Sequence, residues 1–473
     1  MFLDRGQIIG AMDCRVVSNP VDRELVPGKV VWDSRQVVPR CAFLAVKGER
    51  VDGNDFIPQA LDAGASFIIA TEVPSDEIIE RARENDVAIA VVEDHIKAMQ
   101  QLADYSRGKM DARVVGVTGS SGKTTTKNII AKVLGSEFKT TATAANQNNE
   151  LGVPNTVLSA DKDVQALVVE MGMRGFGQIE NLCKFVRPDV GVITNIGVAH
   201  EELLGSQENI AKAKSELISS LPDGRGTAVL NGDDPFTPRI MEFADVSGKG
   251  ISTVLFGMGG GCDVRASDVV YSKAGCPSFE VTFPDKRTVH VDLPLLGSHN
   301  VMNALAAAAV GYVLDMPVER IANALNSAKG QAGRQEIVAA RNGVVVIDDT
   351  YNANPDSMRA ALSLLQMMEA DGRKVAVLGD MGELGEKSPE MHEEVGRLAA
   401  ETGVDVLVTV GEQAEHIAAG ARGAGMPPDK VIECLEVNRA IEALEDLLSQ
   451  GDLVLVKASR FMELEKVVKG LVD

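Results

Sequence analysis

The feature that most constrains this chain is a glycine-rich turn at residues 116–126, which read Gly-Val-Thr-Gly-Ser-Ser-Gly-Lys-Thr-Thr-Thr. The turn follows an apolar run at 112–117 and precedes a helical pattern at 127–134. Where a strand passes through such a turn into a helix, backbone N–H groups and the positive end of the helix dipole converge on one point. That point favours an anion, and above all a phosphate.

The residue types in the turn predict a nucleoside-triphosphate site. Lys123 is placed to reach the outer phosphates, and the hydroxyl of Thr124 to hold Mg²⁺. Val117 takes the position of the first glycine in the common P-loop pattern, so the match is to the variant Thr-Gly-x-x-Gly-Lys-Thr. A flexible turn with a solvated lysine is the alternative. The residues expected around the phosphates are Thr118, Gly119, Ser120, Ser121, Gly122, Lys123, Thr124 and Thr125.

Length and composition exclude several classes of protein. The 473 residues have room for about three domains, at roughly 150 residues each. No apolar run approaches the roughly 18 residues of a membrane span, and charged residues in the first five positions argue against a signal peptide. A formal net charge of −21 disfavours nonspecific binding to nucleic acid or membrane surfaces. Scattered cysteines favour reduced thiols over disulfides or a zinc site. We therefore expect a cytoplasmic protein.

The last third alternates β-branched runs with helical patterns, which predicts a doubly wound parallel sheet of Rossmann type. Ligands of such sheets bind at the carboxyl ends of the strands, where Asp348, Asp349 and Asp380 fall. The predicted strands are 343–349, 374–380, 404–411, 430–435 and 452–459, and the predicted helices are 356–369, 389–401, 413–422 and 438–448.

The middle third repeats this alternation and then changes. Alternating runs at 279–283 and 288–293, joined by Pro-Asp-Lys, predict an antiparallel hairpin. A polar, glycine-bearing segment at 329–335 marks a domain boundary. The remaining predicted elements here are strands at 112–117, 166–170, 190–195 and 227–230 and helices at 300–314 and 318–328.

The first hundred residues suggest a small α/β domain. Strands are expected near 29–33, 41–47, 66–70 and 87–92, with helices at 57–63 and 95–107. The predicted fold is thus α/β in three domains. They are a small N-terminal domain at 1–105, a central P-loop ATPase-like parallel sheet with an antiparallel extension at 106–329, and a C-terminal Rossmann-like domain at 330–473.

Polar residues follow two further strands of the middle third. Glu170 ends one and His200 follows another, at the edge that the glycine-rich turn shares. Thr124 and Glu170 offer the oxygen ligands that Mg²⁺ prefers, whereas histidine is an unusual ligand for this ion. Lys212 and Lys214 lie on the next helix. They are either surface charges or, if buried, neutral amines that add CO₂ to form a metal-binding carbamate.

Three other segments have two interpretations each. Asn300 and Asn303 share a helix face and either cap that helix or contact a nucleotide base. Arg334 lies on the interdomain segment, from which it is able to reach a phosphate. The run 348–355 follows a strand and is either a ribose- or metal-contacting loop or a simple Asn-rich turn.

Together these residues resemble the Mur ligase family, ATP-dependent amide-bond ligases of peptidoglycan precursor synthesis, over nearly the whole chain. The resemblance implies that the glycine-rich turn binds ATP and that Lys214, rather than Lys212, is carbamylated. It implies catalytic roles for Lys123, Lys214 and His200. The implied metal ligands are Thr124, Glu170, His200 and Lys214, and the implied nucleotide contacts beyond the turn are Asn300, Asn303, Arg334 and Asp349.

The segments 146–154, 349–357 and 378–385 are most similar to the family member that adds D-alanyl-D-alanine to UDP-N-acetylmuramoyl-tripeptide. The Asp-Asn-Pro-Arg motif typical of the sister ligase is absent. Segments 33–35 and 46–53 resemble the UDP-sugar-binding segments, with Arg40 replacing a usual glycine and Asn54 a frequent histidine. The implied substrate-contacting residues are Ser34, Arg35, Asn148, Asn149, Asn352 and Asn354.

The resemblance implies a monomer that uses two Mg²⁺ ions and an acyl-phosphate intermediate, in which Arg334 and Asp349 approach ATP when the domains close. Such chemistry needs positioning and charge neutralisation rather than a protein nucleophile. Three alternatives stay open. They are the sister ligase adding diaminopimelate or lysine, a relative of folylpolyglutamate synthase, and a switch or scaffold protein that binds ATP without ligation.

Overall fold

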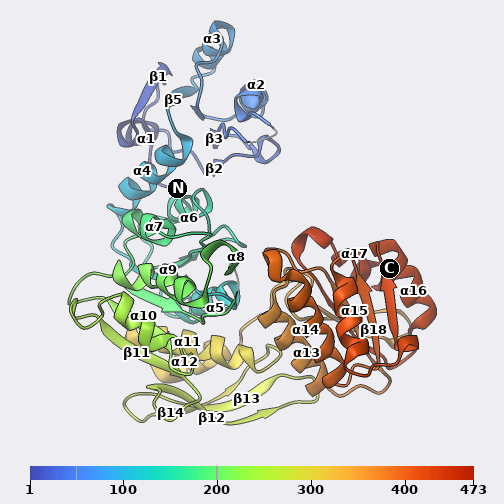
Figure 1. Ribbon diagram of the computed structural model, residues 1–473. Helices are drawn as coiled ribbons and strands as arrows, with labels where there is room; N and C mark the ends of the chain where they lie inside the picture. Colours follow the sequence, from blue (N-terminus) through green and yellow to red (C-terminus); the bar gives the residue numbers. More distant parts are fainter. Residues whose placement is uncertain (49–50, 199–200, 473) are drawn as a thin grey trace.

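The computed structural model describes residues 1–48, 51–198 and 201–472. Within these ranges the strands form three separate sheets, which Figure 1 shows in chain order from blue through green and yellow to red. The α/β class predicted from the sequence is confirmed. Every described helix is too short or too polar to cross a bilayer. The six cysteines all lie in the described ranges and carry free thiols.

The first sheet has the strand order β1-β5-β4-β3-β2, with β1 antiparallel to β5 and the others parallel. The predicted strands and helices here are present, whereas β1, α1 and α3 were not predicted. The elements are β1 (Cys14–Ser18), β2 (Val30–Val31), β3 (Ala42–Leu44), β4 (Phe67–Ala70), β5 (Ala88–Val92), α1 (Arg5–Ala11), α2 (Ile57–Asp62), α3 (Asp76–Glu84) and α4 (His95–Arg107).

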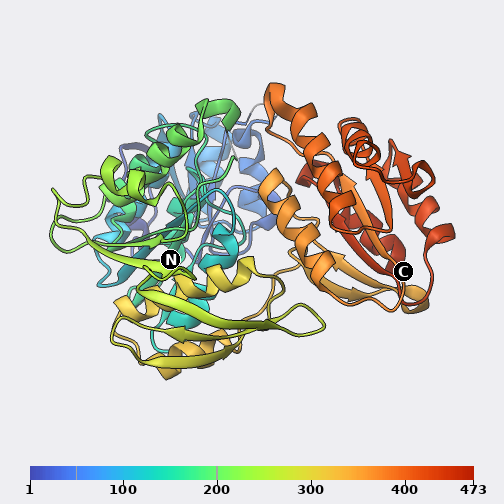
Figure 2. The ribbon, with the colours of Figure 1, turned by 60° about the horizontal axis from the view of Figure 1, so that its bottom comes forward.

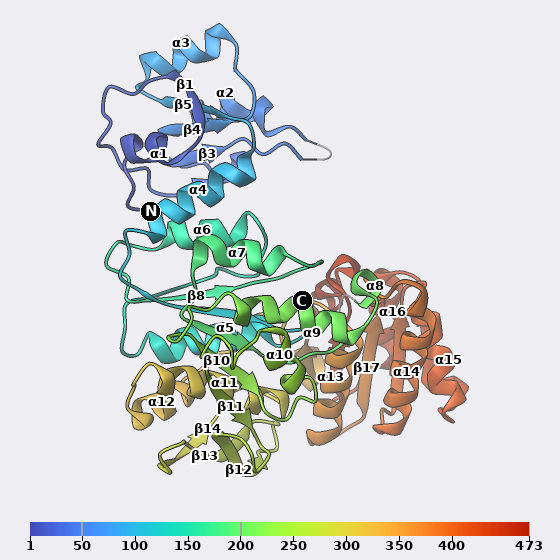
Figure 3. The ribbon, with the colours of Figure 1, turned by 60° about the vertical axis from the view of Figure 1, so that its left-hand side comes forward.

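Helix α4 joins this sheet to the next one. Its residues Met99 and Leu102 pack in the first core, while Ala103 packs in the core of the middle sheet. Arg107 donates to the carbonyls of Val186 (3.1 Å), Met110 (3.1 Å) and Ala112 (3.3 Å), beyond the end of the helix. Figure 3 shows α4 lying between the first sheet and helices α6 and α7.

The middle sheet has the order β14-β13-β12-β11-β10-β9-β6-β8-β7. It is parallel from β7 to β12, and β12, β13 and β14 form the antiparallel extension that contains the predicted hairpin. The strands are β6 (Arg113–Thr118), β7 (Thr140–Ala142), β8 (Ala166–Glu170), β9 (Val190–Ile193), β10 (Thr227–Asn231), β11 (Ser252–Gly257), β12 (Val264–Tyr271), β13 (Pro277–Thr282) and β14 (Thr288–Asp292).

Helices cover both faces of the middle sheet because its strands alternate buried side chains between two cores. Val115 and Val117 of β6 pack against α5, α11 and α12, whereas Val114 faces the core of α6, α7, α9 and α10. The helices are α5 (Lys123–Leu134), α6 (Gly152–Ser159), α7 (Gln178–Val186), α8 (Glu201–Leu204), α9 (Gln207–Ser219), α10 (Thr237–Phe243), α11 (His299–Val313) and α12 (Val318–Leu325).

The third sheet has the order β15-β16-β20-β17-β18-β19, parallel except for the edge strand β15. Each predicted strand and helix of this part is present within two residues of its predicted ends, and β15 and α17 are additional. The elements are β15 (Glu336–Ala339), β16 (Val345–Asp348), β17 (Lys374–Gly379), β18 (Val406–Val410), β19 (Val431–Cys434), β20 (Leu453–Lys457), α13 (Pro355–Met367), α14 (Ser388–Glu401), α15 (Ala414–Gly423), α16 (Val437–Leu447) and α17 (Glu465–Val472).

The third sheet and its helices contact the middle part at several places. Lys273, in the loop after β12, pairs with Glu369 at 2.7 Å, and Figure 2 shows this hairpin end reaching toward the C-terminal part. The amide of Val198 donates to Asp356 Oδ2 at the start of α13, at 3.4 Å. These contacts place the carboxyl ends of the middle strands opposite the first loops of the third sheet.

Candidate active site

A cavity of about 1570 Å³ lies where the carboxyl ends of the middle strands face the third sheet. It gathers predicted site residues from segments far apart in the sequence. The predicted residues that line it are Ser120, Ser121, Gly122, Lys123, Thr124, Thr125, Asn148, Asn149, Glu170, Lys214, Asn300, Asn303, Arg334, Asp349, Asn352 and Asn354.

The glycine-rich turn is held in place before any ligand arrives. Gly119 packs so tightly that a Cβ there would lie 1.8 Å from Thr194 Oγ1, and Gly122 has a left-handed φ of 76°. The amides of Ser120 and Ser121 donate to Asn195, each at 3.0 Å. A preformed loop binds phosphate without first paying the entropy of ordering its backbone.

Lys123 is the first residue of α5, four positions earlier than the helical pattern indicated. Gly122 precedes it as the N-cap, and its left-handed conformation turns the chain directly into the helix. The Lys123 ammonium donates to Gly119 O at 2.8 Å and to Ser120 O at 3.3 Å. The side chain is partly open to the cavity, but its ammonium is buried. This burial lowers the pKa of Lys123, and the negative charge of Glu170 opposes the shift.

Glu170 ends β8 beside Thr124, as predicted. Its Oε1 accepts from Thr124 Oγ1 at 3.1 Å and from Asn148 Nδ2 at 2.8 Å. Its Oε2 is buried and has no hydrogen-bond partner among the described residues. An unpaired buried carboxylate oxygen is costly unless a cation engages it. A carboxylate and a hydroxyl at one point fit Mg²⁺, which takes few protein ligands and bridges phosphates.

The two candidate lysines of α9 differ sharply. Lys212 is exposed, in line with the surface-charge interpretation, whereas Lys214 is 2% exposed and donates to Gly119 O at 3.1 Å. Burial, together with the nearby charge of Lys123, holds the pKa of Lys214 well below its ordinary value of 10.5. Of the two lysines, Lys214 is the one whose lowered pKa favours the neutral amine that carbamate formation requires.

Asn300 is the second residue of α11 and Asn303 the fifth, after the N-cap Ser298. Asn300 donates to Leu296 O at 2.7 Å, and Asn303 donates to Asn300 Oδ1 at 2.8 Å while accepting from Thr126 Oγ1 at 3.0 Å. Neither side chain accepts from a backbone amide of α11, which lies wholly within the described ranges, so the capping alternative is wrong. Asn303 instead ties α11 to α5, directly behind the glycine-rich turn.

Arg334 contacts the phosphate loop from the segment between the middle and third sheets. Its Nη2 donates to Thr124 Oγ1 at 3.3 Å, and its guanidinium lies 4.0 Å from the centroid of the Tyr351 ring. Its buried Nε has no hydrogen-bond partner within the described ranges. A stacked guanidinium with a spare donor beside the loop is suited to bind a phosphate oxygen.

The sequence did not single out Lys457, which pairs with Asp349. The Lys457 ammonium donates to Asp349 Oδ2 at 2.8 Å and to Asn352 O at 2.9 Å. Burial raises the pKa of Asp349, and the charge of Lys457 opposes that rise. The available signal was a lysine inside the otherwise apolar run 453–458, because a strand buried on both faces rarely carries an unpaired charge.

Asn354 has a clear structural role. It is the N-cap of α13, where its side chain accepts from the amide of Ser357 at 2.8 Å and Ser357 Oγ accepts from the amide of Asn354 at 2.9 Å. Asn149 acts similarly, since its Oδ1 accepts from the amide of Gly152 at the start of α6, at 2.9 Å. Their contacts with substrate stay predictions.

The predicted residues of the first domain lie apart from this cavity. Ser34 begins a short 3₁₀ turn, and Arg35 is exposed and pairs with Asp33 at 2.8 Å, holding the pKa of Asp33 at about 2. Arg40 adopts a left-handed φ of 66°, the conformation that favours the glycine usual at this position. Asn54 donates to Thr71 Oγ1 at 2.7 Å.

Three predicted residues of the middle part do not appear in the cavity wall. Thr118 and Gly119 lie behind the wall, and His200 falls outside the described residues.

Comparison with known proteins assigns the family. Family models match as "Mur ligase family, catalytic domain" at residues 29–107, "Mur ligase middle domain" at 117–311 and "Mur ligase, glutamate ligase domain" at 333–460. A curated Bacillus subtilis protein, UDP-N-acetylmuramoyl-tripeptide–D-alanyl-D-alanine ligase, is 37% identical over 461 residues, which cover 97% of this chain and 96% of the relative. The chain therefore belongs to the Mur ligase family.

Two solved structures sharpen the likeness. A crystal structure of MurF from Acinetobacter baumannii has a TM-score of 0.84 and 33% identity, covering 99% of this chain and 98% of that one. MurF ligase from Thermotoga maritima, solved in complex with ADP, has a TM-score of 0.79 and 32% identity, covering 95% and 98%. The similarity thus spans all three sheets.

Proposed function

We propose that this chain is an ATP-dependent ligase that joins D-alanyl-D-alanine to UDP-N-acetylmuramoyl-tripeptide, releasing ADP and phosphate. The observation that carries this proposal is similarity to proteins of that name over nearly the full length of both chains. One such protein has been solved with ADP. The preformed phosphate loop supplies this chain with the matching site.

The middle residues 106–329 would hold the nucleotide. Lys123 leaves the loop carbonyls that it now contacts and donates to the outer phosphates, while the first amides of α5 surround them. Asn300 and Asn303, which line the same cavity, are proposed to contact the base. Thr124 and Glu170 would hold a Mg²⁺ ion, which would supply positive charge beside the phosphate oxygens.

Lys214 is proposed to carry a carbamate. Its neutral amine would form an N–C bond with CO₂ and release one proton, which gives an anionic group at the buried position. The nearby Lys123 charge favours that anion. The carbamate and His200 would hold a second Mg²⁺, although His200 lies outside the described residues.

The reaction would pass through an acyl phosphate. The terminal carboxylate of the tripeptide attacks the γ-phosphorus and ADP leaves; the amine of D-alanyl-D-alanine then attacks the acyl carbon and phosphate leaves. Residues 330–473 would bind the amino substrate through Asn352 and Asn354 and close on ATP through Arg334 and Asp349. Closure excludes the water that would hydrolyse the intermediate.

Residues 1–105 would bind the UDP-sugar end of the tripeptide substrate, with Ser34 and Arg35 as contacts. Since both residues lie apart from the cavity, the bound substrate would have to extend from this domain into the cavity as far as Glu170. Asn148 and Asn149, which line the cavity, are proposed to contact the peptide part of this substrate.

The test is phosphate release from ATP and Mg²⁺ with UDP-N-acetylmuramoyl-tripeptide, with and without D-alanyl-D-alanine. The proposal requires release that depends on the dipeptide, with a pentapeptide product of matching mass. Release with a dipeptide precursor and a free diamino acid instead would assign the chain to the sister reaction. ATP binding without release under either condition would favour a non-ligating switch.

A further inference from the structure

Lys127 is a buried lysine that the proposed chemistry does not use. It lies on α5 one turn after Lys123 and is 2% exposed. Its ammonium donates to Thr143 O at 2.6 Å and to Ala145 O at 3.4 Å. Burial lowers its pKa, against the opposing charge of Glu170. Burying a lysine is costly, so this placement demands a reason beyond filling space.

The two acceptors belong to the segment 143–149, here called the tethered loop, which leads from β7 toward α6. Ala145 in this loop has a left-handed φ of 46°, a conformation that is strained for a residue with a side chain. Such strain persists where surrounding contacts impose it. The hydrogen bonds from Lys127 on both sides of this strained turn are contacts of that kind.

The tethered loop touches Glu170 at two points. Thr143 Oγ1 accepts from the amide of Glu170 at 2.9 Å, and Asn148 Nδ2 donates to Glu170 Oε1 at 2.8 Å. Asn148 is confined from the other side, because its carbonyl accepts from the amide of Gly172 at 2.8 Å and a Cβ on Gly172 would lie 2.9 Å from its Oδ1. The loop therefore holds Glu170 by its backbone amide and by Oε1, the oxygen that also accepts from Thr124 Oγ1.

We propose that Lys127 is a positioning residue for the metal-binding carboxylate. By fixing the tethered loop, it keeps Asn148 on Oε1 of Glu170 and leaves Oε2 unpaired for a divalent cation at the phosphate loop. This role rests on the proposed nucleotide and Mg²⁺ site, and Lys127 acts through the loop without touching substrate. Loss of a residue that orients a metal ligand typically weakens metal binding by about 10- to 100-fold.

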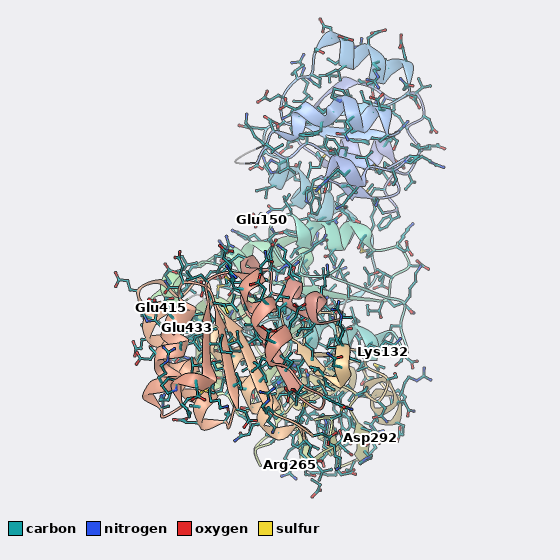
Figure 4. The ribbon with its side chains drawn as sticks, turned by 90° about the vertical axis from the view of Figure 1, so that its right-hand side faces the viewer. Lys132, Glu150, Arg265, Asp292, Glu415 and Glu433 are labelled. Carbon is teal, nitrogen blue, oxygen red and sulfur yellow. The ribbon has the colours of Figure 1, made fainter. Side chains whose placement is uncertain are left out.

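The test compares Lys127→Met with Lys132→Met. The two substitutions are chemically identical and lie on the same helix, but Lys132 is exposed, and Figure 4 labels it. The first readout is hydrogen exchange of the peptide that contains 143–149, measured without ligand. The second is the affinity for ADP, measured by calorimetry over a series of Mg²⁺ concentrations, from which the half-saturating Mg²⁺ concentration is obtained.

The proposal expects faster exchange in the tethered loop and a rise of about 10-fold or more in half-saturating Mg²⁺ for Lys127→Met, with neither change in Lys132→Met. Asn148→Ala should raise the Mg²⁺ requirement too. The double variant should be no worse than the more affected single variant, because both substitutions break one path to Glu170. Lys127→Gln, whose amide is too short to reach both carbonyls, should behave like Lys127→Met and replaces it if that variant does not fold.

An Mg²⁺ requirement within about two-fold of wild type in a folded Lys127 variant would overturn the proposal, as would independent, additive effects of Lys127 and Asn148 substitutions. If the wild-type protein bound no ADP in the presence of Mg²⁺, the proposed function itself would fail. In that case, unchanged hydrogen exchange of the tethered loop in Lys127→Met would separately contradict the proposal that Lys127 fixes this loop.

Discussion

Two buried lysines line the same cavity, Lys457 from strand β20 of the third sheet and Lys214 from helix α9 of the middle part, and in the part of the chain that the structure describes only one of them is paired with a carboxylate. Lys457 of the third sheet has a carboxylate partner, Asp349, at 2.8 Å. Lys214 of the middle part has one hydrogen-bond acceptor among the described residues, the carbonyl of Gly119, and it lies near Lys123. Lys457 thus has a carboxylate partner, whereas Lys214 has none within the described ranges, and this difference is the basis for proposing that Lys214 is modified.

Breaking the C-terminal pair should have the largest effect. Lys457→Met leaves Asp349 buried without its cation, which is expected to cost about 3–5 kcal/mol of unfolding free energy. The measurement is urea unfolding at neutral pH. Lys457→Met combined with Asp349→Asn should recover much of the loss, since it removes both charges. A cost below about 1 kcal/mol for the single variant would show that the pair is not an electrostatic unit.

The matching change in the middle part should act on activity instead of stability. Lys214→Met is expected to lower kcat by about 10²–10³-fold, the effect of losing one electrostatic element of a preorganised site. Its unfolding free energy should stay equal or rise, because methionine fills the space without the cost of burying an ionisable amine. Stability loss comparable to that of Lys457→Met would erase the contrast between the two lysines.

The pH dependence of stability provides a sharper form of the comparison. At neutral pH the unfolded chain protonates Lys214 more fully than the folded chain, so stability should rise with pH from the lowered folded pKa toward the ordinary 10.5. The expected slope is at most about 1.4 kcal/mol per pH unit. The measurement is urea unfolding of the wild type and of Lys214→Met in CO₂-free buffer, from about pH 7 to about pH 9. The difference between the two proteins isolates the contribution of Lys214 to the pH dependence of stability. A wild-type minus variant difference that does not change with pH would contradict the assignment.

The smallest expected effect concerns the start of α13. Asn354→Ala removes its N-cap and should cost about 1 kcal/mol, measured by the same unfolding experiment. Ser357→Ala, which breaks the other half of the capping box, serves as the matched control. A rise in the KM for D-alanyl-D-alanine in Asn354→Ala but not in Ser357→Ala would support the predicted contact between Asn354 and the substrate, in addition to its capping role.

Local patterns predicted most of the third sheet and the phosphate loop, because strand and helix periodicity and glycine placement are short-range signals. The edge strand β15, with the sequence Glu-Ile-Val-Ala, was missed because its short sequence shows no alternation of polar and apolar residues; three of its four residues are exposed. The helix start at Lys123 was also missed, because only the left-handed conformation of Gly122 reveals it.

The functional partners of the buried lysines depend on contacts that sequence spacing does not encode. Lys457 and Asp349 are 108 positions apart and meet through the parallel pairing of β16 and β20. Lys127 donates to backbone carbonyls rather than to a side chain, so the residue types in the sequence do not indicate its partners. Lys214 and Lys212 differ only by which face of α9 they occupy, and burial decides between them.

The most direct measurement of the Lys214 site is a ¹³C NMR spectrum of the protein equilibrated with ¹³C-bicarbonate. The expected result is a carbamate carbon signal in the wild-type protein that is absent in Lys214→Met and retained in Lys212→Met. Absence of that signal from the wild-type protein, or its persistence in Lys214→Met, would contradict the proposal that this lysine accepts CO₂ to supply the missing negative charge.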